Sequence, residues 1–506
     1  MADVDLASTA VRGGAVTLLA QGGRILVGFT STVVLARLLS PSDFGLVAMA
    51  VAVVGVADLL RDFGLSTAAI QANHLSQTQK SNLFWINALV GGICAAGVFL
   101  LAVPIAAFFE QDALIGVVRA LAAAFLINGL STQFKVQITR QLRFGRLACI
   151  EFTGPLMGLV CGIAVSLLTT SYWVIVVQQI SAATTGLVLS VFSARWWPGR
   201  PRRCGQMRDL LTFSLDMLGT QLIAYVAKNV DSIAIGRVWG PTQLGIYDRA
   251  YQVLVVPLNQ LNAPLSRVAI PVFARLSGDD AAFTTAMRKA QLLTSYCTGT
   301  IFALSAALAE PIVAVLFGPE WTAVAPVLAI LALGGVFRSL MQVCFWIYTS
   351  LGLTRAQLKF YLSAQPILIA AVLIGLPWGI VGVAVGHSVG FGIYWILSLW
   401  WVGRVSGVDS CRLATDAVRA LLLFAAPVGT AAFIGCRLVS GTGLQLVVGG
   451  LAAGLAAILA VATIRPVRAD IQALVGLARR AVRRSSRTLD GSGDGRAVVA
   501  GDGAQR

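Results

Sequence analysis

Long runs of apolar residues, separated by short polar segments, repeat along almost the whole chain. The stretch from Leu83 to Ala107 contains no charged residue, and a helix of that length exceeds the roughly 30 Å of a bilayer's hydrocarbon core. The pattern predicts an all-α polytopic membrane protein of about 14 transmembrane helices. We expect them near residues 15–39, 43–60, 82–104, 113–131, 147–169, 172–194, 212–239, 245–271, 291–317, 322–350, 360–376, 379–402, 417–437 and 443–464.

The composition agrees with this pattern. Of the 506 residues, 57% are hydrophobic and 12% are charged, about half the charged fraction of a soluble domain. The net charge of +16 does not indicate nucleic-acid binding, because the basic residues lie in short loops and in the C-terminal tail. Loops that face anionic lipid have this composition.

The basic residues gather in every second loop, for example at Arg140, Arg143 and Arg146. The intervening loops carry acidic residues such as Glu110 and Glu320. Because positively charged loops stay in the cytoplasm, we expect a multi-pass protein of the cytoplasmic (inner) membrane, with its N- and C-termini cytoplasmic.

The chain contains an internal repeat at a constant offset of 200 residues, in which Arg37, Pro41 and Gly45 recur as Arg237, Pro241 and Gly245. Each copy begins a block of six predicted helices, so the two blocks have the same topology. We expect two six-helix bundles related by a pseudo-twofold axis along the membrane normal, with two additional C-terminal helices. The expected organisation is an N-terminal bundle at 1–194, a basic cytoplasmic linker at 195–211, a C-terminal bundle at 212–403, the two additional helices at 404–465, and a basic, partly disordered tail at 466–506.

Three segments, at 36–45, 62–71 and 231–247, resemble the polysaccharide transporter family of the MOP exporter superfamily, which includes Wzx-type flippases. The resemblance implies a bacterial transporter that flips lipid-linked oligosaccharide, of the undecaprenyl-pyrophosphate type, from the inner to the outer leaflet for polysaccharide biosynthesis. It implies this substrate and membrane lipids as partners. The polysaccharide polymerase and glycosyltransferases of the same pathway are further candidate partners.

Ionisable residues within membrane spans are functional candidates, because burying charge in a bilayer is costly. Arg24 lies in the first predicted span, and Lys228 and Asp231 lie three residues apart in the seventh. One interpretation is that Lys228 and Asp231 neutralise each other. The other is that all three line a cavity, where Arg24 and Lys228 attract a pyrophosphate.

The eighth predicted span carries a proline at every seventh position from Pro257, with Asn259 and Asn262 on another side and Arg267 near its inner end. Prolines free backbone carbonyls that need new partners. We expect this helix to line the cavity, unless it is a kinked structural helix with a polar packing seam.

Four further residues allow two interpretations each. The repeat mates Arg37 and Arg237 either anchor lipid headgroups or form a gate. Arg338, in the tenth span, either binds sugar hydroxyls or extends to the interface. His387, in the twelfth, is either a proton carrier or a hydrogen-bonded core residue.

The sequence contains no GxxxxGK[ST] motif and no metal-binding constellation, so we expect no nucleotide hydrolysis, no metal and no cofactor. A membrane glycosyltransferase or polymerase, which would also need a large loop with paired carboxylates, is the less favoured alternative. A cation-coupled multidrug exporter of the same superfamily needs a buried acidic site. In the predicted spans of this chain, basic residues match or outnumber acidic residues, which favours an anionic substrate.

Overall fold

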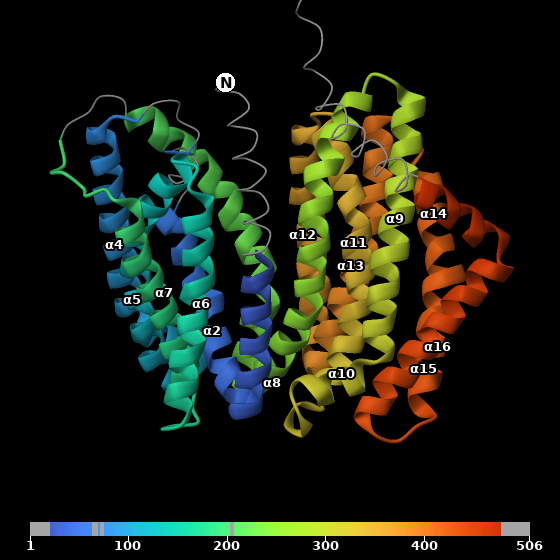
Figure 1. The fold of residues 1–506 in the computed structure, drawn as a ribbon, viewed down its shortest axis with the longest axis horizontal. Helices are drawn as coiled ribbons and strands as arrows, with labels where there is room; N and C mark the ends of the chain where they lie inside the picture. The colour runs from blue at the N-terminus through green and yellow to red at the C-terminus, as the bar shows by residue number, and fades with distance from the viewer. Residues whose placement is uncertain (1–20, 63–68, 71–74, 203–206, 477–506) are drawn as a thin grey trace, which may run out of the picture. The chain divides into compact units, whose positions relative to one another are not determined.

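The computed structural model describes residues 21–62, 69–70, 75–202 and 207–476. These residues form helices joined by short turns (Figure 1), and no strand occurs among them. The helices are 21–38, α2 (Pro41–Asp62), α4 (Gln77–Phe109), α5 (Ala113–Arg140), α6 (Phe144–Ser166), α7 (Trp173–Ala194), α8 (Met207–Leu276), α9 (Asp280–Ala307), α10 (Ala309–Leu316), α11 (Val324–Ser350), α12 (Thr354–Gly375), α13 (Gly379–Ser406), α14 (Ser410–Ala420), α15 (Ala426–Arg437), α16 (Thr442–Thr463) and 465–476.

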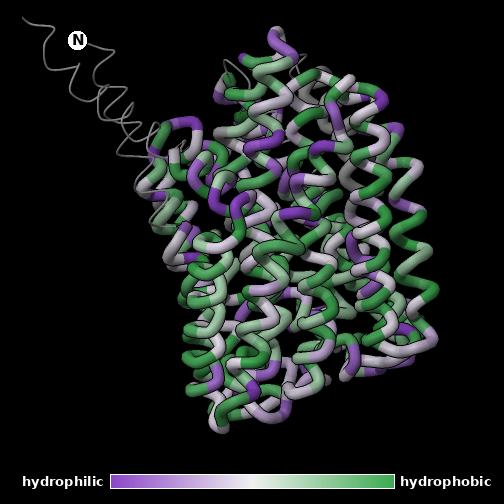
Figure 2. The backbone as a smooth tube through the Cα atoms, turned by 90° about the vertical axis from the view of Figure 1, so that its right-hand side faces the viewer, coloured by the Kyte–Doolittle hydropathy of each residue, from purple (hydrophilic) through white to green (hydrophobic). Residues whose placement is uncertain are grey.

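Hydrophobic residues predominate along these helices (Figure 2). Within the described residues, nine stretches are long and apolar enough to cross a membrane, or ten if α9 and α10, bent by 75°, form one span. One of the nine, Thr354–Ser406, contains a turn. The helices α12 and α13 pack closely on either side of it, because a Cβ on Gly375 would overlap the carbonyl oxygen of Gly382. The prediction of an all-α polytopic membrane protein is confirmed.

Helix α8 is 70 residues long and would extend for about 105 Å if it were straight. It is broken at Gly240, whose φ of 77° and ψ of −177° are not helical. Positive φ is accessible to glycine without steric cost, and the following residue is Pro241. The two spans predicted at 212–239 and 245–271 therefore lie on either side of this break.

The chain divides into two compact units. The first consists of Met1–Val253, Val313–Val327 and Gln365–His387, and so includes the start of the second sequence repeat. Its helices pack through glycines. A Cβ on Gly158 of α6 would lie 2.6 Å from the carbonyl oxygen of Gln178 on α7. Small residues allow such close approach between transmembrane helices.

The repeated segments meet within this first unit. A Cβ on Gly45 would overlap the carbonyl oxygen of Pro241, and a Cβ on Gly245 would overlap that of Pro41. Both glycines are fully buried. The two copies of the repeat therefore touch through equivalent residues, backbone against backbone.

The second unit consists of Leu254–Ile312, Leu328–Ala364 and Ser388–Arg506. In it, α9 packs against α14 and α15. Helix 465–476 packs through the fully buried Val467 onto Leu292, Tyr296 and Ala420. The described part of the predicted tail is thus a docked helix.

Candidate functional site

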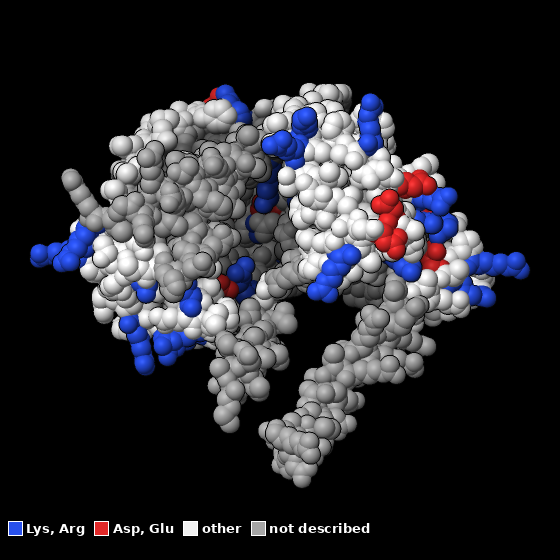
Figure 3. Space-filling model, turned by 90° about the horizontal axis from the view of Figure 1, so that it is seen from above, with Lys and Arg blue, Asp and Glu red and all other residues white. Residues whose placement is uncertain are grey.

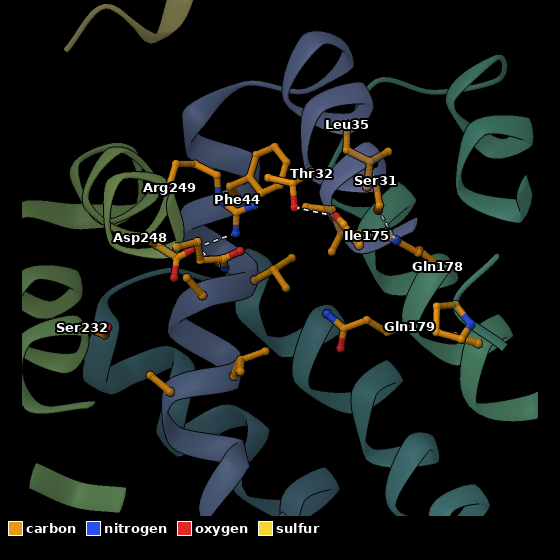
Figure 4. A pocket seen from close by; sticks show the side chains of 18 of the residues that line it. Ser31, Thr32, Leu35, Phe44, Ile175, Gln178, Gln179, Ser232, Asp248 and Arg249 are labelled. Carbon is orange, nitrogen blue, oxygen red and sulfur yellow. Dashed lines mark hydrogen bonds and ion pairs between the residues drawn. The ribbon is translucent and has the colours of Figure 1, made fainter. Parts of the chain in front are cut away.

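Two neighbouring cavities lie inside the first unit. The cavity that we call the amide chamber has a volume of about 430 Å³ (Figure 4). Helices 21–38, α7 and α8 supply its polar wall, which consists of Ser31, Thr32, Gln178, Gln179, Asn229, Ser232, Asp248, Arg249 and Gln252. The lining residues on α2 are apolar.

The second cavity, the charged chamber, has a volume of about 510 Å³. Its polar wall comes from five elements, helices 21–38, α2, α5, α6 and α7, and consists of Arg24, Asp58, Asn128, Lys135, Glu151 and Gln179. The two chambers share the wall residues Val51, Pro155, Gln179 and Ala182. A single elongated polar ligand could therefore extend from one chamber into the other.

Two consecutive glutamines on α7 line the amide chamber. Gln178 donates from Nε2 to Ser31 Oγ at 2.5 Å. Gln179 makes no hydrogen bond with any other described residue, and it lines both chambers. An amide offers two donors and an acceptor with two lone pairs. Gln179 is therefore able to bind hydroxyl groups without first breaking a contact of its own.

A buried ion pair closes one side of the amide chamber. Arg249 is only 8% exposed, and its Nη2 lies 2.6 Å from Asp248 Oδ2. The guanidinium also lies 4.3 Å from the centroid of the Phe44 ring, a favourable cation–π arrangement. Gln252 donates to the same Asp248 oxygen at 3.1 Å. Within the described structure, Arg249 Nε has no hydrogen-bond partner.

The charged chamber contains one loosely paired and one unpaired cation. Arg24, 57% exposed, lies 3.8 Å from Glu151. Asp58 pairs with Arg61 at 3.2 Å. Among the described residues, the half-buried ammonium of Lys135 has neither an ion-pair nor a hydrogen-bond partner. An unpaired cation in a low-dielectric cavity attracts anions strongly.

Together the chambers can bind a ligand group that has hydroxyls at one end and negative charge at the other. No group of three or more His, Cys, Asp or Glu in the described part of the chain could hold a metal ion.

A model of the polysaccharide biosynthesis protein family matches residues 34–326, more than half of the chain. The chain belongs to this family. The resemblance predicted from residues 36–45, 62–71 and 231–247 is thereby confirmed, and the family is one of transporters.

Two curated relatives are similar over most of this chain. The teichuronic acid biosynthesis protein TuaB of Bacillus subtilis is 27% identical over 315 residues, 62% of this chain and 65% of TuaB. The match thus spans just under two thirds of TuaB. The lipopolysaccharide biosynthesis protein WzxC of Escherichia coli is 25% identical over 371 residues, 72% of this chain and 74% of WzxC.

The fold is also that of a solved transporter. The lipid II flippase MurJ, in an inward closed conformation, superimposes with a TM-score of 0.68 over 88% of this chain and 98% of MurJ, at 14% sequence identity. At this identity the similarity concerns the fold alone.

The structure separates the three charged residues that the sequence grouped in a cavity. Arg24 lines the charged chamber, whereas Lys228 is exposed and lines neither chamber. Asp231 is buried at 7% exposure and accepts hydrogen bonds from the Tyr247 hydroxyl and the Ser232 N–H, both at 2.8 Å. Both of these hydrogen bonds come from residues of α8 itself.

The polar side chains of the proline-bearing helix do not all face the cavity. Gln252 faces the amide chamber, whereas Ser266 accepts hydrogen bonds from Gln342 and Trp346 of α11, at 3.2 and 2.9 Å. Asn262 has a buried Oδ1 with no partner among the described residues. Around Ser266 the helix has the polar packing seam that was the alternative interpretation. The side chains of Asn259 and Arg267 lie outside the described residues.

The remaining candidates have local partners. Arg37 donates to the carbonyl oxygens of Val315 and Leu316, at the C-terminal end of α10, where helix carbonyls lack intrahelical partners. Arg237 pairs with Glu110 at 2.7 Å on the surface. In the second unit, Arg338 lies 5.6 Å from the Phe391 ring.

His387 is buried at 5% exposure. Its ring lies 5.7 Å from that of Tyr251, edge to face. This aromatic contact fits the interpretation of His387 as a core residue.

Sequence reasoning missed the chamber residues Lys135, Glu151 and Arg249. Lys135 and Arg249 lie close enough to the ends of predicted spans to resemble loop charges. The consecutive amides of Gln178 and Gln179, in the middle of an apolar stretch, were a signal that could have been found, since polar side chains within a membrane span need partners.

Proposed function

We propose that this chain is a flippase for lipid-linked oligosaccharide in bacterial polysaccharide biosynthesis. Its substrate is of the undecaprenyl-pyrophosphate type and moves from the inner to the outer leaflet by alternating access, without ATP hydrolysis. Family membership supports transport in a polysaccharide pathway. WzxC is a lipopolysaccharide biosynthesis protein and MurJ is a lipid II flippase, which supports a membrane-bound, lipid-linked substrate.

The observation that carries this proposal is the junction of two unlike chambers at Gln179. The pyrophosphate would bind at Arg24 and Lys135, where one cation is unpaired and the other is loosely paired. The adjoining sugar would bind at the amides of Gln178, Gln179 and Gln252, because amides match hydroxyls as donors and acceptors. The lipid tail would stay among the acyl chains.

The same proposal includes the topology. We assign fourteen membrane crossings. Nine of them are single helices, namely the helix containing 21–38, α2, α4, α5, α6, α7, α11, α12 and α13. Helix α8 provides two crossings, one on each side of its break, and the remaining three are α9 with α10, α14 with α15, and α16. The halves at 1–194 and 212–403 would be related by a pseudo-twofold axis, for which the reciprocal contacts of Gly45 and Gly245 give local support. Both termini would be cytoplasmic.

Flipping is tested directly with Lys135→Ala and Arg24→Ala in a strain whose own copy of the gene is deleted. Surface polysaccharide is measured together with protein abundance in the membrane. Losing one charge-assisted contact to phosphate should lower transport at least about tenfold. The matched control is Arg119→Ala, an exposed cation on the same helix as Lys135 that lies 5.0 Å from the Phe99 ring.

The purified protein, reconstituted in vesicles, then distinguishes the alternatives. A flippase exposes a lectin-detectable glycolipid at the opposite leaflet, and the two chamber variants slow this step while Arg119→Ala does not. Equal rates in all three variants would refute the assignment of the chambers. Efflux of a cationic drug, or sugar transfer from a sugar nucleotide, would indicate one of the two alternative functions.

A further inference from the structure

The segment between α7 and α8 is held in place along its backbone. We call residues 195–202 the strap. Its Gly199 N–H donates to Ser81 Oγ, and Trp85 Nε1 donates to the Gly199 carbonyl, both at 2.9 Å. Asn82 donates to the Arg202 carbonyl at 2.6 Å and accepts from the Arg202 N–H at 3.0 Å. Three side chains at the start of α4 thus fix four backbone groups of the strap.

Fixing the backbone in this way turns the two strap tryptophans in different directions. Trp196 packs edge-to-face on Phe84 and Phe134, inside a hydrophobic cluster. Trp197 is 75% exposed. The strap's three basic side chains are exposed as well, namely Arg195, Arg200 and Arg202. Of these two tryptophans, Trp197 is therefore the one that presents its indole to the surroundings.

The location of the strap is the boundary of the membrane. It follows the end of the candidate span Trp173–Ala194 and lies against the start of the candidate span Gln77–Phe109. Figure 3, which views the structure from above, shows exposed Lys and Arg side chains at several places on this surface. The strap contains no acidic residue, and α4 has none in its first turn.

Membrane topology alone does not explain why the strap has a defined conformation. The bias of basic residues toward cytoplasmic loops depends on charge during insertion and does not require a loop to adopt one conformation. Here four hydrogen bonds fix the backbone at Gly199 and Arg202, the part of the strap that carries Arg200 and Arg202 and follows Trp197. A fixed arrangement matters when a ligand has a definite geometry, as a phosphate bound by guanidinium groups does.

We propose that the strap is a binding site for the headgroup of an anionic phospholipid. The guanidinium groups of Arg200 and Arg202 bind the phosphate, and Arg195 adds positive charge. The indole of Trp197 lies among the glycerol and headgroup atoms, where tryptophan is most stable in a bilayer. An acidic protein segment is the competing ligand, but it would not require an exposed tryptophan at the depth of the headgroups.

The experiment compares phosphatidylglycerol with phosphatidylcholine, each titrated into the purified full-length protein and followed by native mass spectrometry. Asn82→Ala removes two of the four hydrogen bonds that hold the strap but keeps every charge. The double variant Arg200→Lys with Arg202→Lys keeps the charge and the topology but removes the bidentate donors. The control is Arg404→Lys, which changes an exposed arginine at the end of α13.

We expect both strap variants to bind phosphatidylglycerol about tenfold more weakly, as for the loss of one charge-assisted contact, with phosphatidylcholine binding and the control unchanged. If Asn82→Ala does not fold, the double lysine variant still tests the proposed lipid site. The proposal is overturned if the lysine variant binds phosphatidylglycerol as tightly as the wild type. It is also overturned if an oligoglutamate peptide binds at the strap and phosphatidylglycerol does not.

Discussion

Gly45 lies so close to Pro241 that a side chain on this glycine would overlap the proline's carbonyl oxygen. Gly245 stands in the same relation to Pro41. These four residues are matched at an offset of 200 in the sequence, so two copies of one motif meet through the same atoms. Only glycine allows two backbones to approach this closely.

Substituting Gly45 by Ala should therefore destabilise the protein. The neighbour is a backbone carbonyl, which cannot rotate away, so we expect a loss near the upper end of the about 1–3 kcal/mol that overpacking costs. Thermal unfolding in detergent measures it. Gly92→Ala on α4 is the control, since a Cβ there meets no atom within 4 Å. Equal melting temperatures for the two variants would contradict the close contact.

Replacing Arg249 by Met should destabilise the first unit by about 3 kcal/mol, the lower end of the range for breaking a buried ion pair. The side chain of Asp248 is 21% exposed, so water can solvate its charge and the loss of stability is smaller than for a fully buried pair. The double variant Asp248→Asn with Arg249→Met should recover most of the stability without recovering transport. Thermal unfolding and the vesicle assay, performed on both variants, separate the two effects. Full transport by the double variant would show that Arg249 has only a structural role.

Gln179→Leu should separate transport from folding. Gln179 makes no hydrogen bond with the other described residues, so its removal should change the free energy of unfolding by no more than about 0.5 kcal/mol. Loss of one hydrogen bond to a sugar should slow transport about tenfold. Gln178→Leu, which also breaks the bond to Ser31, should affect both quantities. The prediction fails if Gln179→Leu transports at the wild-type rate.

Asp416 holds the end of α14 in the second unit. Its side chain is 4% exposed and accepts from Arg288 Nε at 2.7 Å and Nη2 at 3.2 Å. Arg419 lies 3.5 Å away and also binds Asp470 of helix 465–476. Asp416→Asn should therefore cost at most about 3 kcal/mol, because it removes the buried anion that two partly exposed arginines bind. The measurement is the melting temperature.

The control for Asp416 is another aspartate of the same region. Asp409 is the N-cap of α14 and accepts from the Arg412 N–H at 3.1 Å. Asparagine is an equally good N-cap, so Asp409→Asn should leave the melting temperature nearly unchanged. A larger shift for Asp409→Asn than for Asp416→Asn would refute the role of the buried network.

The helices were predictable because the bilayer imposes a simple requirement on every crossing segment. A stretch such as Leu83–Ala107 must satisfy its backbone internally, so it forms a helix whatever surrounds it. The break in α8 was also predictable, because Gly240 and Pro241 interrupt the pattern between two apolar runs. The conformation of the strap was not predictable from the sequence, because it depends on hydrogen bonds with Ser81 and Asn82, more than a hundred residues earlier in the chain.

The site was predicted only in part, and Lys135 shows why. From the sequence it belongs to a basic loop, since Arg140 and Arg143 follow closely. In the structure α5 continues to Arg140, and Lys135 faces a chamber that four other elements complete. Lys228 differs, since the sequence predicted it to line the cavity, whereas the side chain is exposed and lines neither chamber.

By itself the sequence determined the membrane environment, the helical class, the internal repeat and the family, because each depends on local hydrophobicity or on residues close together in the chain. The tertiary structure decided which polar groups share a cavity and which have partners. Those properties depend on the rotation of each helix about its axis and on its neighbours. A change of one residue turns a helical side chain by about 100°, and hydrophobicity alone does not specify that angle.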